Sequence, residues 1–305
     1  MAVPATYKLD LIGFPSSNYV KQITDSSVMS GLNTVTESPA GHRYPMFLAN
    51  DLIQPSLEFS STQLKTLLGL IPPGGIGIAA VTPYFKAAAA TGNVARATTS
   101  HYKTQFNNVV ACVQSIELNT QGPARARVQI MPSYDGTNAP VVYTGSVALP
   151  VSLVATELFT LGPTAINGTA VSGVKSVTIN FGVQLVPEQT DGEQYPTFVH
   201  IDRIAPTVRI QTIAAVNWAT YGLGGLALNG TTGWATFARR YEADKSRYAD
   251  NASQHLEWQA SFGKVVPQGT TGRGVDLVTD DLLIQLRTNA DTDDAITYTP
   301  DVAIA

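Results

Sequence analysis

The histidines and the cysteine are the residues of this chain most suited to catalysis or metal binding. The histidines are His42, His101, His200 and His255, and no two have the HxxxH or HExxH spacing of a metal site. A single cysteine, Cys112, excludes an intramolecular disulfide, a thiolate-rich zinc site and a CxxC redox pair. No GxSxG motif presents a nucleophilic serine. The sequence therefore predicts no catalytic, cofactor-binding or metal site.

Two acidic clusters could offer oxygen ligands to a hard cation such as calcium. They are Asp280-Asp281 and the run from Asp291 to Asp294, and both lack the glycine and distal glutamate of an EF-hand loop. A solvated loop or an acidic patch is the favoured interpretation. Asp51 and Asp202 each stand four residues before a proline. We expect each of these two carboxylates to accept a hydrogen bond from a nearby backbone N–H rather than to take part in catalysis.

Basic and aromatic residues complete the candidates. Arg239, Arg240, Lys245 and Arg247 form the one basic cluster, and acidic residues interleave with it, which favours a salt-bridge surface between subunits. The three tryptophans could form the aromatic platform of a carbohydrate-binding module. They are Trp218, Trp234 and Trp258.

Period-2 alternation dominates the chain and predicts a mainly β fold. From Val177 to Leu185, apolar residues alternate with small or polar ones, which predicts one long half-buried strand. Two short stretches, Ser61–Leu70 and Thr212–Tyr221, are predicted to be helical. The other predicted strands are Tyr7–Ile12, Pro55–Phe59, Ile76–Phe85, Thr99–Phe106, Val109–Leu118, Ala124–Met131, Thr197–Ile201, Thr207–Gln211 and Leu277–Arg287, with turn signals such as Asn107-Asn108 between them.

An internal repeat organises these elements. The segment Tyr44–Phe59 aligns without gaps to Tyr195–Ile210, at an offset of 151 residues. Six of sixteen positions are identical, where unrelated segments would share about one. The identical pairs are Tyr44/Tyr195, Pro45/Pro196, Phe47/Phe198, Asp51/Asp202, Ile53/Ile204 and Pro55/Pro206.

Three further blocks follow in the same order. Gly74-Gly75 corresponds to Gly224-Gly225, His101 to His255, and the segment from Tyr143 to the one from Tyr298, so that the offset changes from 151 to 150, 154 and 155. Insertions in loops between fixed strands produce such a drift. The alternative is an accidental alignment of two β-rich segments. We interpret the chain as two domains, residues 1–150 and 151–305. They hold two copies of one module, at roughly residues 5–150 and 156–305, joined by a short linker at Val151–Val154.

The repeated order of elements resembles the tube module of long-tailed phages, as found in their major tail (tail tube) proteins. The most similar parts are Glu157–Thr169 (ELFTLGPTAINGT), the Val174–Val186 segment, the DGEQYP run that ends at Pro196, and Ser133–Pro140 before a closing strand. The resemblance covers nearly the whole chain. The chain lacks the additional immunoglobulin-like domain of many relatives, so a decorated surface is not implied.

The resemblance implies a fold and a role. Each module would be a β-sandwich or half-barrel with one short helix, and six modules would close a ring around a DNA channel. With two modules per chain, three chains would form a pseudo-hexameric ring, and rings would stack into the tube. The implied partners are further copies of the chain and the tip, terminator and tape-measure proteins of the tail, with DNA only as passing cargo. The implied location is the virion, after assembly in the host cytoplasm.

Composition agrees with such a role. The chain is 44% hydrophobic and 14% charged, which excludes intrinsic disorder, and its net charge of −4 argues against binding DNA through phosphate neutralisation. Residues 1–150 carry a net charge of +2 and residues 151–305 one of −6. No apolar stretch approaches the length of a membrane span, and we expect no signal peptide and no membrane insertion. A tail-tip hub or distal ring protein, a β-sandwich enzyme and a carbohydrate-binding module stay open as alternatives.

Overall fold

A computed structural model of the chain describes residues 6–38, 40, 43–88, 101–213, 220–222, 224–230, 233–242, 246–271, 279–290 and 293–304. The prediction of a mainly β fold is confirmed, because strands β1 to β22 make up most of these residues. Helical structure in the described ranges is limited to α1, the 3-10 turn η1 and the residues Thr220 and Tyr221. None of the described helices is long and apolar enough to cross a membrane.

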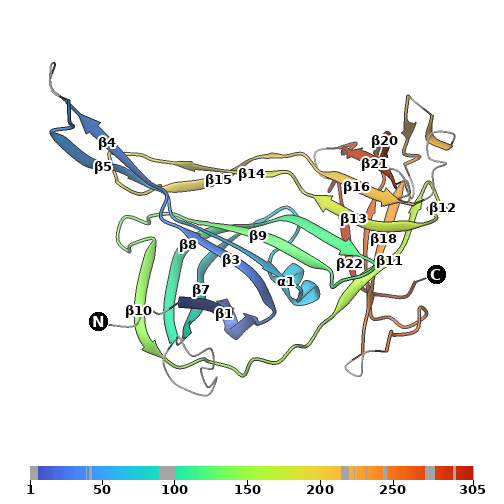
Figure 1. Cartoon of the computed structure of the whole chain (residues 1–305), viewed down its shortest axis with the longest axis horizontal. Helices are drawn as coiled ribbons and strands as arrows, with labels where there is room; N and C mark the ends of the chain where they lie inside the picture. The colour runs from blue at the N-terminus through green and yellow to red at the C-terminus, as the bar shows by residue number, and fades with distance from the viewer. Residues whose placement is uncertain are drawn as a thin grey trace.

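The first half of the chain contains a long curved sheet and one helix (Figure 1). Its elements are β1 (Thr6–Phe14), η1 (Pro15–Ser17), β2 (Asn18–Val20), β3 (Ile23–Met29), β4 (Leu32–Glu37), β5 (Phe47–Ile53), β6 (Ser56–Ser61), α1 (Leu64–Leu70), β7 (Ile76–Ala88), β8 (His101–Asn119), β9 (Arg125–Pro132) and β10 (Val141–Val147).

The second half has a corresponding succession of strands. Its elements are β11 (Phe159–Ile166), β12 (Thr169–Ala170), β13 (Val174–Asn180), β14 (Val183–Glu188), β15 (Phe198–Ile204), β16 (Thr207–Thr212), β17 (Leu226–Ala227), β18 (Trp234–Arg240), β19 (His255–Ala260), β20 (Gly263–Thr271), β21 (Thr279–Leu286) and β22 (Thr297–Val302).

One sheet of thirteen strands runs through both halves, since β13 of the second half pairs with β8 of the first. A separate five-stranded sheet has the order β12-β11-β18-β19-β22. Two hairpins, β4–β5 and β14–β15, are not part of either sheet. Figure 1 shows that β14–β15 runs across β8 and β9, whereas β4–β5 projects away from the body as an arm.

The buried side chains follow the alternation of the strands and the inner face of the helix. In β9, Ala126, Val128 and Ile130 are fully buried, whereas Arg125 and Arg127, which alternate with them, are exposed. Leu64 and Leu67 of α1 are fully buried against the same core. Each such leucine contributes about 1.5–3 kcal/mol relative to an exposed position.

Two predicted strand boundaries are wrong. The predicted strand Val177–Leu185 is two strands, because the chain bends at Gly182, which has a φ of 59°. Conversely, the turn predicted at Asn107-Asn108 is absent and β8 continues through it. Asn108 adopts a φ of 46° there, and its amide donates a hydrogen bond to the Ser133 hydroxyl at 2.6 Å, so the residue distorts the strand without reversing it.

The strand pairings of the two halves have corresponding registers. In β3–β6 the pairs run from Ile23↔Ser61 to Met29↔Ser56, and every pair in β13–β16 lies 151 residues further on, including the irregularity after the first pair. The two hairpins β4–β5 and β14–β15 also match pair for pair at an offset of 151. The pairings β8–β9 and β20–β21 match in the same way at an offset of 154.

Candidate assembly interface

The junction between the two halves is a β-sheet contact. Strand β13 pairs antiparallel with the end of β8, from Ser176↔Asn119 to Asn180↔Ser115. The Phe181 N–H donates to the Gln114 carbonyl at 3.0 Å, and the Gln114 side-chain amide donates to the Val183 carbonyl at 3.2 Å. The edge of β13 is therefore satisfied by the first half of the same chain.

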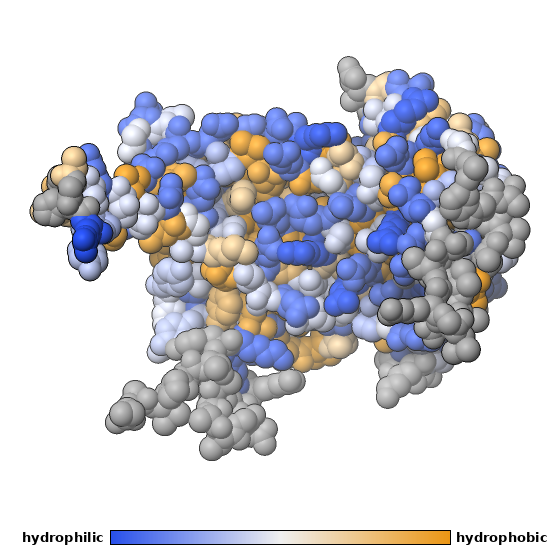
Figure 2. Space-filling view, turned by 45° about the horizontal axis from the view of Figure 1, so that its top comes forward, coloured by the Kyte–Doolittle hydropathy of each residue, from blue (hydrophilic) through white to orange (hydrophobic). Residues whose placement is uncertain are grey.

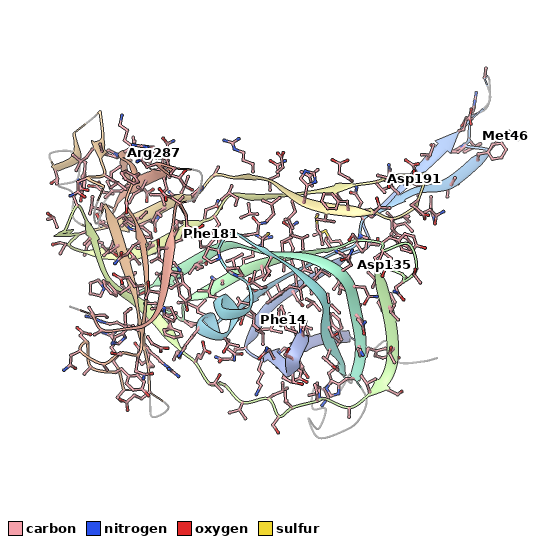
Figure 3. All side chains as sticks on the ribbon, turned by 180° about the vertical axis from the view of Figure 1, so that it is seen from behind. Phe14, Met46, Asp135, Phe181, Asp191 and Arg287 are labelled. Carbon is pink, nitrogen blue, oxygen red and sulfur yellow. The ribbon has the colours of Figure 1, made fainter. Side chains whose placement is uncertain are left out.

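The β14–β15 hairpin lies on the first half beyond this junction. Val183 and Val199 are buried there, and the Ile201 side chain reaches the backbone at Gly75. At the far end of the hairpin, the Tyr134 N–H donates to the Pro196 carbonyl at 2.7 Å. Figure 3 shows Asp191 at this end, close to the base of the β4–β5 arm.

A glycine sets the bend between each sheet and its hairpin. Gly31 and Gly182 have φ values of 56° and 59°, a region that other residues adopt at a cost. A Cβ at Gly31 would lie 2.0 Å from the Gln54 carbonyl oxygen, and one at Gly182 would lie 2.2 Å from that of Ala205. The close approach leaves no room for a side chain. Neither glycine was predicted to be important from the sequence, although the two are 151 residues apart, the offset of the aligned segments.

Corresponding apolar residues differ in burial between the halves. Ile179 and Val199 are buried where the second half covers the first, whereas their counterparts Val28 and Leu48 are 41% and 72% exposed. Val183 and Leu32 show the same contrast. Figure 2 shows hydrophobic residues among polar ones at the end of the molecule that carries the β4–β5 arm, and Figure 3 places Met46 near the tip of that arm. The first half thus exposes a surface whose counterpart in the second half is buried.

The segment before β11 is fastened to α1 by a buried carboxylate. Glu157 accepts hydrogen bonds from the backbone N–H of Lys65 at 2.8 Å and of Thr66 at 3.1 Å, and from the Thr66 hydroxyl. The Gln22 side chain accepts from the backbone N–H of Glu157 and donates to its carbonyl. A carboxylate at the first turn of a helix also interacts favourably with the helix dipole. No pattern in the sequence singled out Glu157 for this contact.

A tight loop in the first half supports the far end of the β14–β15 hairpin. The Asp135 carboxylate accepts hydrogen bonds from the Asn138 side chain and from the backbone N–H groups of Asn138 and Thr137. These bonds, led by the one from the Asn138 side chain, lower the pKa of Asp135 to about 2. The neighbouring ring of Tyr134 lies 6.3 Å from that of Tyr195.

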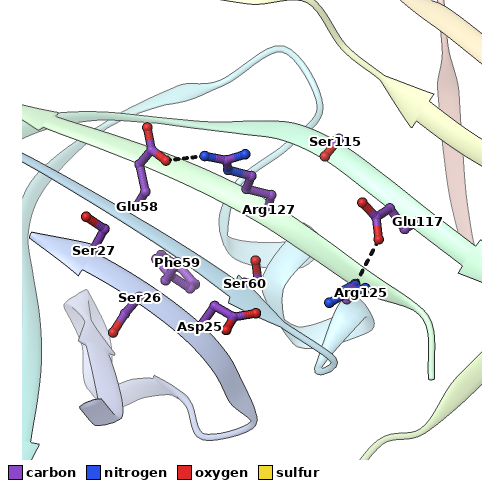
Figure 4. A pocket seen from close by; sticks show the side chains of 10 residues that line it. All are labelled: Asp25, Ser26, Ser27, Glu58, Phe59, Ser60, Ser115, Glu117, Arg125 and Arg127. Atoms are coloured by element: carbon purple, nitrogen blue, oxygen red, sulfur yellow. Dashed lines mark hydrogen bonds and ion pairs between the residues drawn. The ribbon is translucent and has the colours of Figure 1, made fainter. Parts of the chain in front are cut away.

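An open hollow of about 300 Å³ lies over β3, β6, β8 and β9 (Figure 4). Four of its charged groups are paired, since Arg127 lies 2.5 Å from Glu58 and Arg125 lies 2.9 Å from Glu117. Asp25, which also lines the hollow, forms no ion pair with the described residues. No histidine or cysteine lines it. Among the described residues, no group of three or more histidine, cysteine or acidic side chains could hold a metal ion. The hollow therefore offers two surface ion pairs and one exposed carboxylate, with no histidine or cysteine beside them.

The predicted duplicate positions fall on corresponding strands and loops. Pro55 and Pro206 are both buried just before β6 and β16. By contrast, Tyr44 and Pro45 are exposed near the tip of the arm. Their counterparts Tyr195 and Pro196 are half-buried and buried against the first half.

Asp51 and Asp202 lie at the same irregularity of their hairpins. Asp51 is the extra residue between the pairs Leu52↔Asn33 and Asn50↔Thr34, and Asp202 is the extra residue at the corresponding place in β15. Both side chains are exposed and neither carboxylate forms a hydrogen bond with the described residues. The expected hydrogen bonds to the backbone are therefore wrong.

His101 and His255 are both buried at corresponding ends of β8 and β19. The His255 Nδ1 accepts the Arg240 N–H at 3.2 Å, and its Nε2 lies 3.0 Å from the Ala249 carbonyl oxygen. His101 Nε2 lies 3.6 Å from the Asp10 carboxylate. His200 stacks on Phe198, and His42 lies outside the described residues.

Two of the other predicted surfaces are different in the structure. Asp280 is buried and Asp281 lies 2.5 Å from Arg209, so this pair is not a solvated acidic loop. Trp234 and Trp258 are fully buried, which removes them from any aromatic platform. Asp291 and Trp218 lie outside the described residues.

The basic cluster makes contacts within the chain. Arg239 lies 2.8 Å from Asp250, Arg240 donates to the Gln254 side chain, and Arg247 donates to the Tyr241 hydroxyl. Lys245 is outside the described residues. We expected these residues to form salt bridges between subunits. The three described arginines instead contact residues of the same chain.

Comparison of the sequence with models of known protein families gives no match. A search of curated proteins gives none either.

Proposed function

We propose that the chain is a structural subunit of the tail tube of a long-tailed phage. Residues 1–150 and 151–305 are then two tandem tube modules, each a β-sandwich or half-barrel with one short helix. Three chains close a pseudo-hexameric ring, and rings stack into a tube that conducts DNA during infection. The protein is assembled in the host cytoplasm and resides in the virion with the other tail proteins.

The observation that carries the proposal is the matching register of the two halves. Accidental similarity between β-rich segments does not predict that three separate strand pairings agree pair for pair, with irregularities at the same places. A reversed ion pair adds support. Glu58 and Arg127 form a diagonal ion pair across β6 and β9, and the corresponding diagonal positions across β16 and β21 hold Arg209 and Asp281. A tandem repeat suits ring building, because each chain then supplies two equivalent segments of the circle.

The physical chemistry of the surface also suits a conduit. An exposed sheet edge promotes aggregation unless it is paired, and ring closure pairs it. Interface cores are depleted in charge, in agreement with a chain that is 14% charged. A lumen rich in lysine and arginine would hold DNA through its phosphates, whereas a neutral or acidic one lets it slide. The net charge of −4 is compatible with passage rather than binding.

Negative-stain microscopy of the purified protein tests the proposal. We expect tubes built of stacked rings. Single rings that do not stack would favour a tail-tip hub or distal ring protein instead. Monodisperse particles at all concentrations would refute a self-assembling role and return attention to a binding module or an enzyme.

A further inference from the structure

The junction pairs the edge of β13 with the edge of β8. Each of these two edges has a counterpart elsewhere in the chain, and both counterparts are uncovered. Strand β13 uses its free edge to pair with β8, but the corresponding strand β3 pairs only with β6 among the described strands, and its outer residues are exposed. The segment of β20 that corresponds to the end of β8 is Gly269–Thr271, which pairs with β21 on one side and has no described strand on the other. One chain thus carries an uncovered counterpart of β13, which is β3, and an uncovered counterpart of the end of β8, which is Gly269–Thr271.

Resting on the proposed function, we propose that β3 of one copy pairs antiparallel with β20 of a second copy, as β13 pairs with β8. The offsets of 151 and 154 residues fix the register. Ile179↔Ile116 becomes Val28 opposite Thr270, and Asn180↔Ser115 becomes Met29 opposite Gly269. The partner surface is thereby a defined strand edge of the same protein rather than an unspecified apolar patch.

Burial at the internal junction indicates which side chains the second copy covers. Ile179 is fully buried in the junction, and its counterpart Val28 is 41% exposed at the edge of β3. Burying the remaining apolar surface of Val28 is favourable. The pairing also satisfies the free N–H and C=O groups of β3, which are otherwise left to solvent.

A glutamine recurs at the junction. Gln114 contacts the chain at Phe181 and Val183 through its carbonyl and its side-chain amide. The residue 154 positions later is Gln268, adjacent to the free segment of β20 and exposed. At the proposed contact, Gln268 of the second copy takes the place of Gln114. Its side-chain amide then faces the Leu32 carbonyl of the first copy, the counterpart of the Val183 carbonyl.

The β4–β5 arm has a corresponding place on the second copy. The β14–β15 hairpin rests beside Gly75, whose counterpart is Gly225 at the start of β17. Leu226, next to it, is 37% exposed. The arm of one copy therefore lies across β17 and β20 of the next, which covers Leu32 and Leu48. Because the two surfaces differ, the contact is head-to-tail and propagates from copy to copy.

Disulfide trapping tests the register. Two single variants, Val28→Cys and Thr270→Cys, are mixed, allowed to assemble and exposed to oxidised glutathione. Directly opposite residues of antiparallel strands are close enough for a disulfide. We expect a covalent dimer in the mixture and none with either variant alone. Ser27→Cys mixed with Thr270→Cys is the matched control, since neighbouring residues point to opposite faces, and it should give no dimer.

Charge substitution in the exposed arm gives a second test that leaves the fold intact. Leu48→Glu should prevent assembly, because its counterpart Val199 is buried at the junction. Phe47→Glu should permit assembly, because its counterpart Phe198 is 59% exposed even with the first half beneath it. Assembled rings without the disulfide, or with Leu48→Glu, would overturn this pairing and leave the proposed function standing. Wild-type protein that never assembles would overturn both.

Discussion

Replacing Glu157 with alanine tests how the second half of the chain is held on the first. The substitution removes the acceptor of two backbone N–H groups at the start of α1 and of the Thr66 hydroxyl, at a residue that is only 8% exposed. Each lost charge-assisted hydrogen bond of this kind costs about 1.5–3 kcal/mol. Water reaches part of the freed helix end, so we expect a loss of about 3 kcal/mol in the free energy of unfolding.

Urea unfolding followed by tryptophan fluorescence measures this loss, because Trp234 and Trp258 are buried in the native protein. Glu157→Gln keeps one acceptor oxygen and should recover about half of the loss. Glu117→Ala is the matched control, since Glu117 pairs with Arg125 on the surface, where such pairs are worth about 0–1 kcal/mol. A Glu157→Ala variant as stable as the Glu117→Ala variant would refute the fastening role of this carboxylate.

Three further predictions concern single residues. Burial raises the pKa of the Cys112 thiol to about 12, so the thiol is protonated at pH 8. It should therefore resist maleimide in the native protein and react with it in urea. Reaction in the native state would contradict its burial. Asp135 should titrate near pH 2 by NMR and contribute stability above pH 3.8 that is lost as the pH falls through 2, whereas Asn138→Ala should return its pKa towards 3.8. Gly182→Ala should lower the free energy of unfolding by more than about 2 kcal/mol, because of backbone strain and the close contact with Ala205. Gly168→Ala, with open space around its Cβ, should lower it by about 1 kcal/mol. Equal losses would refute the steric argument.

The sequence predicted the β class and most strand positions because alternation reports directly which residues face the core. It failed where one residue decides the path of the backbone. The alternation of apolar and polar residues from Val177 to Leu185 continues through Gly182. This alternation alone does not reveal a bend at a glycine with positive φ. Asn108 gave the opposite error, since an asparagine that favours turns can also be accommodated within a continuous strand.

The candidate interface was predictable only in part. The offset of 151 residues placed Tyr44 with Tyr195 and Pro45 with Pro196, but no sequence pattern indicates that only the second member of each pair is covered. That difference depends on β13 pairing with β8, a contact between segments far apart in the chain. Glu157 was missed for the same reason, because its partners belong to α1.

Cryo-electron microscopy of the assembled protein tests the central claim most directly. The account predicts stacked rings of three chains with pseudo-six-fold symmetry, continuous β-sheet between β3 and β20 of neighbouring copies, and a lumen that is not strongly positive. Rings of six chains, a strongly positive lumen, or particles that stay monomeric would contradict it.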